Sequence, residues 1–375
     1  MARLENLARG PVPSHRTKVA LPTAARSRTV PAMRAGIATW SGFMVAAAWM
    51  LWSATAGAES LGEAFKRVTP SVVVIRARGQ ELTREGERSF TETGSGVLVS
   101  SDGKVMTAAH VVHTMDEIHV EFLGGETVAA RVISSEPAAD LSLLQLEKVP
   151  AGARPARMAD SDTVQVGDSV MIVGAPYGLS YSLSTGIISA RWAPNTMYKS
   201  MPLAEFFQTT ATINTGNSGG PMFNMAGDVI GIVSHNISKS GGSEGLGFVV
   251  TLNTAKQLLL ERRFFWSGLE GQFLPDRIAD MLNLPENATG YLVKSVAKGS
   301  PGEALGLRPG RSLVVIDGQE WALGGDVVLE VQSIQFKPAN LPRVREAMSR
   351  LKPGEQLKVK VLRAGRILEL STAAP

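Results

Sequence analysis

A serine enclosed by glycines stands in residues 216–220, which read Gly-Asn-Ser-Gly-Gly. Glycines let the backbone turn tightly, so the Ser218 hydroxyl is exposed and neighbouring N–H groups can point at a developing oxyanion. A serine hydroxyl is a poor nucleophile until a base removes its proton. The segment therefore indicates a nucleophile, provided that the chain also supplies a base.

Two upstream segments supply this base and a carboxylate to orient it. His110 follows an apolar run, which places it at the end of an expected strand. Asp140 precedes the apolar run 141–146, and a carboxylate at the head of a buried strand needs a polar partner such as an imidazole N–H. The imidazole needs the carboxylate to fix its tautomer and stabilise its charged form. Together the segments predict a triad in the order His110, Asp140, Ser218.

The other histidines fit the role of base less well. His15 lies in the leader, and His113 and His119 are expected to be solvated. His235 ends the run 229–233, where placement at the surface is favoured over approach to the cleft. No pair of histidines has the spacing of a metal site, and the absence of cysteine excludes thiolate catalysis. We expect neither a metal nor a cofactor.

Residues 216–220 also match the G-x-S-x-G elbow of α/β-hydrolases. That elbow requires a strand–turn–helix context with the histidine after the serine. Here a turn and an expected strand follow Ser218, and every histidine except His235 precedes it. The α/β-hydrolase interpretation is therefore set aside.

The first 58 residues are typical of an export signal. The apolar run 42–52 is followed by Ala56-Gly57-Ala58, the small-x-small pattern of a cleavage site. Met33 would begin a leader of ordinary length, so it is a candidate for the true start. We expect cleavage before Glu59 and export to the periplasm. The alternative is an uncleaved membrane anchor over residues 37–58.

The chain's net charge of +4 comes from this leader. Its seven basic and one acidic side chains leave a net charge of −2 for the remaining residues. The body of the protein therefore has no basic field to attract nucleic acid. A length of 375 residues with 44% hydrophobic residues is typical of two or three globular domains.

Beyond the leader, two domains are expected. Short β-type runs with Gly, Pro, Asp and Asn turn signals fill residues 71–250, which indicates an all-β barrel or sandwich. Residues 254–262 predict a helix with Asn253 as N-cap. The remainder mixes strands with two short helices at 301–305 and 342–351. We expect the leader to span 1–58, the β domain 59–264 and the C-terminal domain 268–373.

These segments resemble the HtrA/Deg family of trypsin-like serine proteases. The parallels in the β domain are Gly94-Ser95-Gly96-Val97, Thr107 to His110, Ala139-Asp140-Leu141, Asn214 to Pro221 and Gly245-Leu246-Gly247-Phe248. The C-terminal domain resembles the family's PDZ domain from Gly290 through Ser300-Pro301 to Gly310.

The resemblance implies a mostly β protein, with a chymotrypsin-like double β-barrel followed by a small α/β PDZ domain. By resemblance, Ser218 is the nucleophile, His110 the general base and Asp140 its orienting carboxylate. The backbone N–H groups of Gly216 and Ser218 would form the oxyanion hole. The family also implies a trimeric homo-oligomer that cleaves unfolded or mislocalised proteins.

Some positions depart from the family pattern. Thr215 and Thr210 stand where the family usually has proline and aspartate, so they bear on substrate preference more than on chemistry. Residues 312–324 are additional to the usual PDZ domain. Neutral Asn217 replaces the aspartate of digestive trypsins, so activation by a freed N-terminal amine is excluded and activity would depend on loop ordering.

A PDZ domain binds a peptide by adding it as a strand and holding its terminal carboxylate with backbone N–H groups. The residues expected to do so are Gly290, Tyr291, Leu292 and Val293. The alternative is that they form an ordinary entry from loop to strand. An alternative function also stays open, a non-proteolytic PDZ-bearing chaperone or scaffold, because the sequence alone does not show that the triad aligns.

Overall fold

The computed structural model describes residues 59–178, 181–239, 242–262, 266–282, 284 and 289–375. The predicted leader, with its cleavage site and alternative anchor, lies outside these residues. Residues 59–375 form one compact unit. No helix in the described part of the chain is long and apolar enough to cross a membrane.

The described chain begins with α2 (Leu61–Val68), which a capping box starts. The Ser60 hydroxyl accepts a hydrogen bond from the Glu63 backbone N–H, and the Glu63 carboxylate accepts one from the Ser60 N–H. These bonds satisfy two donors that a helix N-terminus would otherwise leave unpaired. The helix leads through the short turn η1 (Thr69–Ser71) into the first strand.

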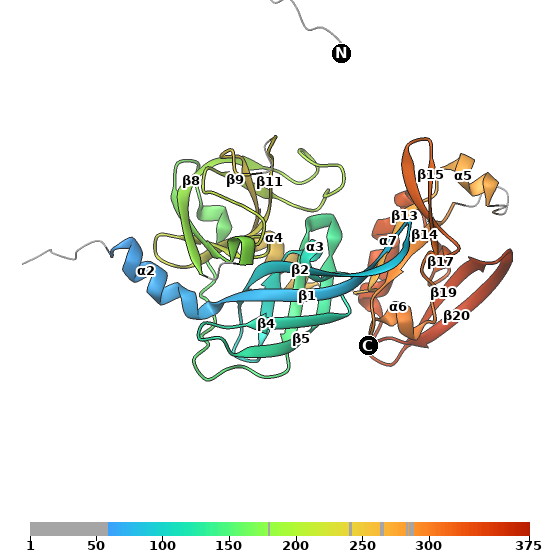
Figure 1. Cartoon of the computed structure of the whole chain (residues 1–375), viewed down its shortest axis with the longest axis horizontal. Helices are drawn as coiled ribbons and strands as arrows, with labels where there is room; N and C mark the ends of the chain where they lie inside the picture. Colours follow the sequence, from blue (N-terminus) through green and yellow to red (C-terminus); the bar gives the residue numbers. More distant parts are fainter. Residues whose placement is uncertain (1–58, 179–180, 240–241, 263–265, 283, 285–288) are drawn as a thin grey trace, which may run out of the picture. The chain divides into compact units, whose positions relative to one another are not determined.

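The first closed barrel has six antiparallel strands in the order β1-β2-β3-β6-β5-β4 (Figure 1). They are β1 (Val72–Thr83), β2 (Gly86–Leu98), β3 (Lys104–Thr107), β4 (Glu117–Glu121), β5 (Thr127–Glu136) and β6 (Leu141–Leu146). Pairing of β1 with both β2 and β4 closes the barrel. Mainly branched apolar side chains, such as Val73, Ile75 and Leu144, fill its interior.

The second closed barrel repeats this plan in the order β10-β11-β12-β9-β8-β7. Its strands are β7 (Ser169–Gly174), β8 (Ser182–Trp192), β9 (Phe206–Thr209), β10 (Pro221–Asn224), β11 (Val229–Asn236) and β12 (Gly247–Thr251). The expected double barrel of a mostly β protein is therefore confirmed.

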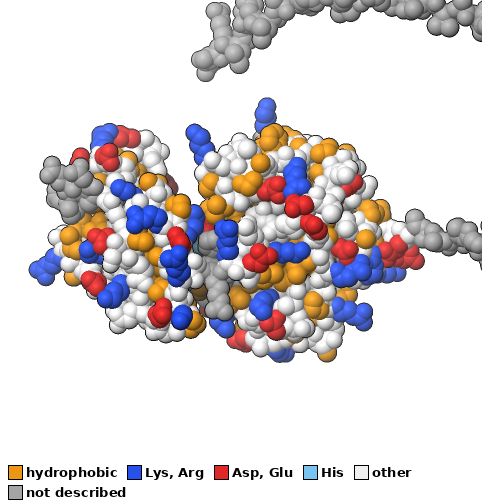
Figure 2. All heavy atoms as spheres, turned by 180° about the vertical axis from the view of Figure 1, so that it is seen from behind, with side chains coloured by type: hydrophobic (Ala, Val, Ile, Leu, Met, Phe, Trp, Pro, Cys, Tyr) orange, Lys and Arg blue, Asp and Glu red, His pale blue; other side chains and the backbone are white. Residues whose placement is uncertain are grey.

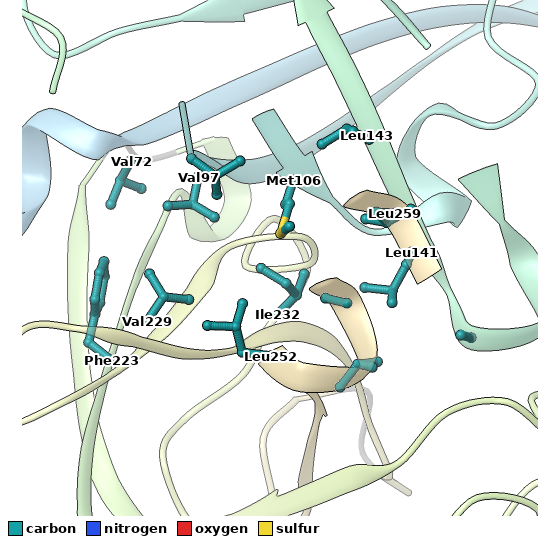
Figure 3. Close-up of a cluster of buried hydrophobic side chains, with 14 of the residues drawn as sticks. Val72, Val97, Met106, Leu141, Leu143, Phe223, Val229, Ile232, Leu252 and Leu259 are labelled. Atoms are coloured by element: carbon teal, nitrogen blue, oxygen red, sulfur yellow. The ribbon is translucent and has the colours of Figure 1, made fainter. Parts of the chain in front are cut away.

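A third apolar cluster joins the two barrels (Figure 3). Its members come from facing strands of both barrels, among them Val72, Val97, Met106, Phe223, Val229 and Ile232. Burial of this cluster holds the two barrels against each other, because apolar surface removed from water stabilises the contact. The candidate catalytic residues lie in the segments that connect the strands of the barrels.

Short helices connect the strands. They are α3 (Ala109–Val112), η2 (Pro137–Ala139), η3 (Ser161–Thr163), η4 (Pro176–Gly178), α4 (Leu252–Ala255) and the π-helical turn η5 (Lys256–Glu261). The predicted helix at 254–262 thus begins earlier, at Leu252, with Thr251 at its N-cap position. Asn253 is not the cap, since it lies inside the helix and its side-chain amide donates to Asp160 at 2.7 Å.

The C-terminal domain is a sheet in the order β13-β14-β17-β19-β20, with β18 beside β17 and a separate β15–β16 hairpin. The strands are β13 (Leu269–Phe273), β14 (Tyr291–Val296), β15 (Ser312–Ile316), β16 (Gln319–Leu323), β17 (Val327–Val331), β18 (Ile334–Gln335), β19 (Gln356–Arg363) and β20 (Arg366–Ala373). The helices are α5 (Asp276–Met281), α6 (Pro301–Ala304), η6 (Pro338–Asn340) and α7 (Leu341–Arg350).

The additional residues 312–324 form the β15–β16 hairpin of this domain. Strand β13 was not expected from the sequence, because its residues lie where the apolar pattern breaks. On the surface, acidic and basic side chains are interspersed over the face that Figure 2 displays. This distribution agrees with the small net charge of the chain beyond its leader.

Candidate active site

His110 lies in α3, directly after β3, rather than at the end of a strand as expected. Thr107, the last residue of β3, donates its hydroxyl proton to the Ser95 carbonyl oxygen at 2.8 Å. This bond ties the start of the α3 turn to β2. The His110 backbone N–H donates to Asp140 Oδ1 at 3.1 Å, so the carboxylate holds both the backbone and the ring of this residue.

Asp140 follows η2 and takes a left-handed backbone conformation with φ 53° and ψ 43°. Residues other than glycine rarely adopt this conformation, and it costs about 1 kcal/mol. It lets the chain turn from η2 into β6 while the carboxylate faces α3. Nδ1 of His110 lies 2.9 Å from Oδ1 and 3.0 Å from Oδ2 of Asp140.

The contact between these two side chains changes both pKa values. Burial alone would raise the pKa of Asp140, whose side chain is 10% exposed, but the bond and charge of His110 outweigh burial and lower that pKa. Desolvation alone would lower the pKa of His110, but the hydrogen bond and negative charge of Asp140 raise it above its usual value. Asp140 is thus a carboxylate that favours the imidazolium form of His110.

Ser218 stands in a tight turn between β9 and β10. Gly219 has φ 81°, and a Cβ atom there would lie 2.1 Å from Thr107 Oγ1, so only glycine fits. Its N–H donates to the Val233 carbonyl oxygen at 2.7 Å, and the Ser218 carbonyl oxygen accepts from the Ser95 N–H at 2.8 Å. These contacts hold the turn between the two barrels.

The Ser218 hydroxyl donates to the Ser234 carbonyl oxygen at 3.1 Å. Within the described residues, no hydrogen bond joins this hydroxyl to His110. The structure therefore brings His110 and Asp140 into contact and places Ser218 beside them in a resting orientation.

Ser234 is a site residue that the sequence analysis missed. Its buried hydroxyl donates to Oδ2 of Asp140, and its carbonyl oxygen holds the Ser218 hydroxyl. One residue of β11 therefore contacts both the carboxylate and the nucleophile. A polar residue directly after the buried apolar run 229–233 was the available signal, since buried hydroxyls need partners.

Gly216 begins the turn before Ser218, with φ 99°. A Cβ atom there would lie 2.2 Å from the Ala175 carbonyl oxygen, so a side chain would clash. The Gly216 carbonyl oxygen accepts from the Ser95 hydroxyl at 2.7 Å. This bond fixes the orientation of the peptide group between Gly216 and Asn217. Within the described residues, the N–H groups of Gly216 and Ser218 donate no hydrogen bond, so both are available to an anionic oxygen.

Two of the remaining histidines lie elsewhere than expected. His113 is not solvated, since its ring contacts the Ser135 hydroxyl at 2.8 Å and the Leu269 carbonyl oxygen at 3.1 Å. His235 does not project from the surface, since its ring packs among Tyr198, Phe206 and Phe248. His119 is exposed on β4, as expected.

The four residues expected to bind a peptide lie at the start of the central strand β14. Tyr291 pairs with Phe273 of β13 on one side and with Val328 of β17 on the other. Contrary to the expectation from the sequence, this strand therefore has no free edge to which a peptide could be added. Gly290 is explained by packing, because a Cβ atom there would lie 2.3 Å from the Val327 side chain. Leu292 and Val293 are buried.

In this sheet β13 and β20 are the two end strands of the order, so each is paired on one side only among the described strands. A cavity of about 460 Å³ lies between β13 and α7. Its apolar lining includes Leu269 and Phe273 of β13, Tyr291 of β14, and Val344 and Met348 of α7. Protease-domain residues 135–138, which immediately precede Ala139 and Asp140, also contribute to the lining.

Comparison with known families assigns both domains. The family described as Trypsin-like peptidase domain matches residues 94–232, and the family described as PDZ domain matches residues 246–373. Their order along the chain is that of the two barrels and the C-terminal sheet.

Curated relatives are similar to this chain over most of its length. The chain is 33% identical over 302 residues to the "Probable periplasmic serine endoprotease DegP-like" of Hahella chejuensis, covering 78% of this chain and 59% of the relative. The protein of the same name from Chlamydia trachomatis is 34% identical over 287 residues, covering 74% and 52%. The chain thus spans about half the length of these relatives. Both are named as periplasmic, which supports the expected export.

A solved structure is similar over most of this chain. A variant of the HtrA-type protease AlgW, determined with a decapeptide, has a TM-score of 0.50 and 26% sequence identity, covering 84% of this chain and 97% of that chain. The predicted resemblance is therefore confirmed. With its trypsin-like double barrel followed by one PDZ domain, the chain belongs to the HtrA/Deg family of serine proteases.

Proposed function

We propose that this protein is an exported serine endopeptidase that cleaves unfolded or mislocalised proteins, with Ser218 as nucleophile, His110 as general base and Asp140 as its orienting carboxylate. The observation that carries the proposal is the contact of both Asp140 oxygens with Nδ1 of His110. The Ser218 hydroxyl is held nearby on the carbonyl oxygen of Ser234, whose own hydroxyl donates to Asp140. Nδ1 carries the proton toward the carboxylate, so Nε2 is the atom free to act as a base.

In the proposed reaction, the Ser218 hydroxyl leaves the Ser234 carbonyl and turns toward Nε2 of His110. The imidazole takes the hydroxyl proton as Oγ attacks the scissile carbonyl carbon. The carbonyl oxygen becomes an oxyanion, and the N–H groups of Gly216 and Ser218 donate to it. Neither N–H group has another partner among the described residues, so no hydrogen bond to those residues has to break first.

The leaving amine then takes the proton from the imidazolium of His110, and the peptide C–N bond breaks. The acyl group stays on Oγ of Ser218 until His110 removes a proton from water and the resulting hydroxide attacks the ester carbonyl. The ester bond breaks, and Ser218 recovers its proton from His110. Asp140 stays ionised throughout, because its hydrogen bonds and the charge of the imidazolium stabilise the carboxylate.

The PDZ domain is proposed to bind substrate or regulatory C-termini in the groove between β13 and α7. A peptide added along β13 would place its side chains on Leu269, Phe273 and Met348, which line the groove. Tyr291 also lines it, so one of the four residues expected from the sequence keeps a proposed role in peptide binding. Assembly into a trimer stays a prediction, which sedimentation equilibrium of the mature protein would test.

The decisive experiment compares Ser218→Ala with the wild type on casein and on a short peptide substrate. We expect turnover to fall by at least about a thousand-fold while the far-UV circular dichroism stays unchanged, because the nucleophile is lost and the fold is kept. The control is Ser101→Ala, which alters an exposed turn serine and should retain full activity. Addition of EDTA should leave the wild-type rate unchanged.

Equal cleavage by the wild type and Ser218→Ala would overturn the protease proposal. An inactive wild type that still prevents aggregation of an unfolded protein would favour the chaperone alternative. The assay decides between the two functions, because the Ser218 hydroxyl is bonded to the Ser234 carbonyl oxygen and must leave it before it can act as a nucleophile.

A further inference from the structure

A second imidazole is connected to the carboxylate of the candidate triad, on the side away from His110. The Ser234 hydroxyl contacts Oδ2 of Asp140. Oγ of Ser234 also lies 2.9 Å from Nδ1 of His235. The contacts therefore form a continuous chain from His235 through Ser234 and Asp140 to His110. The first two residues of this chain are neighbours in β11.

The direction of the protons in this chain follows from the number of donors. An ionised carboxylate can only accept hydrogen bonds, and a hydroxyl has one proton to donate. Ser234 must give its proton to Asp140, so its oxygen accepts in the contact with His235. Nδ1 of His235 consequently carries a proton, and Nε2 of the neutral ring is without one.

The surroundings of His235 agree with a neutral ring in this tautomer. Its Nε2 is buried without a hydrogen-bond partner among the described residues, so a proton there would have no acceptor. The ring stacks on Phe248 with centroids 5.2 Å apart and planes at 17°. The Tyr198 ring lies nearly perpendicular to it, with centroids 4.9 Å apart. Desolvation lowers the pKa of His235, and the charge of Asp140 only partly opposes this. His110 is the further titratable group that acts on it.

We propose that His235 is a positioning residue of the protease, whose Nδ1–H fixes the Ser234 hydroxyl and thereby strengthens its hydrogen bond to Asp140. This role rests on the proposed endopeptidase function. Hydrogen bonds in a chain polarise one another, so a donor to the Ser234 oxygen makes its hydroxyl a better donor. The carboxylate is then better stabilised by its own bonds and favours the imidazolium of His110 less.

This arrangement predicts the direction of a change in pH dependence. Removing the Nδ1–H of His235 weakens the bond from Ser234 to Asp140, so the negative charge acts more fully on His110. The pKa of His110 then rises, and because turnover needs its neutral form, the acid limb of kcat/KM moves to higher pH. The loss of one neutral hydrogen bond corresponds to a shift of about half a pH unit.

The test uses two substitutions that separate the donor from the ring. His235→Phe keeps an aromatic ring against Phe248 and has no N–H, whereas His235→Asn has no ring but can donate from an amide nitrogen near the position of Nδ1. We expect His235→Phe to shift the acid limb upward by about half a unit and to lower kcat several-fold with KM nearly unchanged. His235→Asn should keep the wild-type acid limb, even if its melting temperature falls.

Either of two results would overturn the proposal. One is an unshifted acid limb in His235→Phe, and the other is an equal shift in both variants, which would assign the effect to the ring rather than to the N–H group. The same series includes Ser218→Ala. An active Ser218→Ala would instead refute the endopeptidase function itself, so the two failures are distinguishable.

A second measurement does not depend on the variants keeping their activity. The ring nitrogens of the mature wild-type protein, labelled with 15N-histidine, report the tautomer of each neutral imidazole by NMR. We expect His235, assigned by the signal lost in His235→Asn, to have a protonated Nδ1 and a bare Nε2 at neutral pH. A protonated Nε2 with a bare Nδ1 would reverse the direction of donation and refute the proposal.

Discussion

At the residue scale, Asp140 controls the electrostatics of the candidate site. It accepts hydrogen bonds from the backbone and ring of His110 and from the Ser234 hydroxyl. A buried carboxylate with several donors stays ionised, and its charge acts on the imidazole in contact with it. The raised pKa of His110 is therefore a consequence of the left-handed turn that aims Asp140 at α3.

Asp140→Asn should change both the rate and its pH dependence. The wild-type acid limb of kcat/KM should lie above the usual histidine pKa of about 6.5, because activity is lost as the pH falls through the raised pKa of His110. Without the carboxylate this pKa falls, so the acid limb of the residual activity should move to lower pH. We expect kcat to fall about ten-thousand-fold, because the asparagine amide favours the wrong imidazole tautomer.

The measurement is a pH–rate profile on a peptide substrate. Asp280→Asn, at an exposed position in α5, is the control and should reproduce the wild-type profile. An acid limb that stays in place in Asp140→Asn would show that this carboxylate does not set the pKa of the base.

At the scale of elements, the one-sided strand β13 and helix α7 determine where a peptide can bind. Their facing side chains line the apolar cavity, while β14 has neighbours along both edges. Met348 lies on the α7 face toward the cavity, and Ser349, the next residue, is exposed. This pair provides a test in which the same side chain is introduced on two faces of one helix.

Met348→Asp should weaken binding of a peptide with an apolar C-terminal residue at least ten-fold, because a carboxylate in the groove repels the terminal carboxylate and removes apolar contact. Ser349→Asp should bind as the parent does. Both changes are made in the full chain carrying Ser218→Ala, and fluorescence polarisation of a labelled peptide measures affinity. Amidation of the peptide's C-terminus should also weaken binding, and equal affinity for both peptide forms would argue against a carboxylate site.

At the scale of the whole molecule, the PDZ domain contacts the segments that carry His110 and Asp140. The indole N–H of Trp266, just before the predicted start of this domain, donates to the His113 carbonyl oxygen at 2.8 Å, three residues beyond His110. Arg345 of α7 bonds to Glu136 at 3.0 Å, four residues before Asp140. Helix α7 thus lines the proposed peptide groove and, through Arg345, forms an ion pair with the buried Glu136 carboxylate of the protease domain.

Arg345→Met should destabilise the protein, because the Glu136 side chain is only 6% exposed and would lose its charged partner. We expect the free energy of unfolding to fall by roughly 1–3 kcal/mol, the usual range for a hydrogen bond to a charged group. Urea denaturation followed by tryptophan fluorescence measures this change. Arg343→Met, at an exposed position on the same helix, should change stability by less than about 0.5 kcal/mol. Equal stability of both variants would show that the ion pair contributes nothing.

Local sequence determined much of this protein. The apolar runs predict the strands, and the turn residues between the runs predict an all-β barrel or sandwich. The types and order of His110, Asp140 and Ser218 indicate the chemistry, since nucleophile, base and carboxylate are recognisable as residue types. Gly216 and Gly219, which flank Ser218, reflect close approach of two backbones, which the structure locates at Ala175 and Ser95.

Tertiary structure alone decided what surrounds these residues. Ser234 and Asp140 are 94 positions apart, and only the packing of the two barrels brings the hydroxyl of one to the carboxylate of the other. The same packing buries His235, which the sequence places at the end of a strand without showing which side its ring faces. The free edge of β13 likewise depends on the order of strands in the sheet. Contacts across barrels and pairing between distant strands depend on long-range geometry, which residue types along the chain do not encode locally.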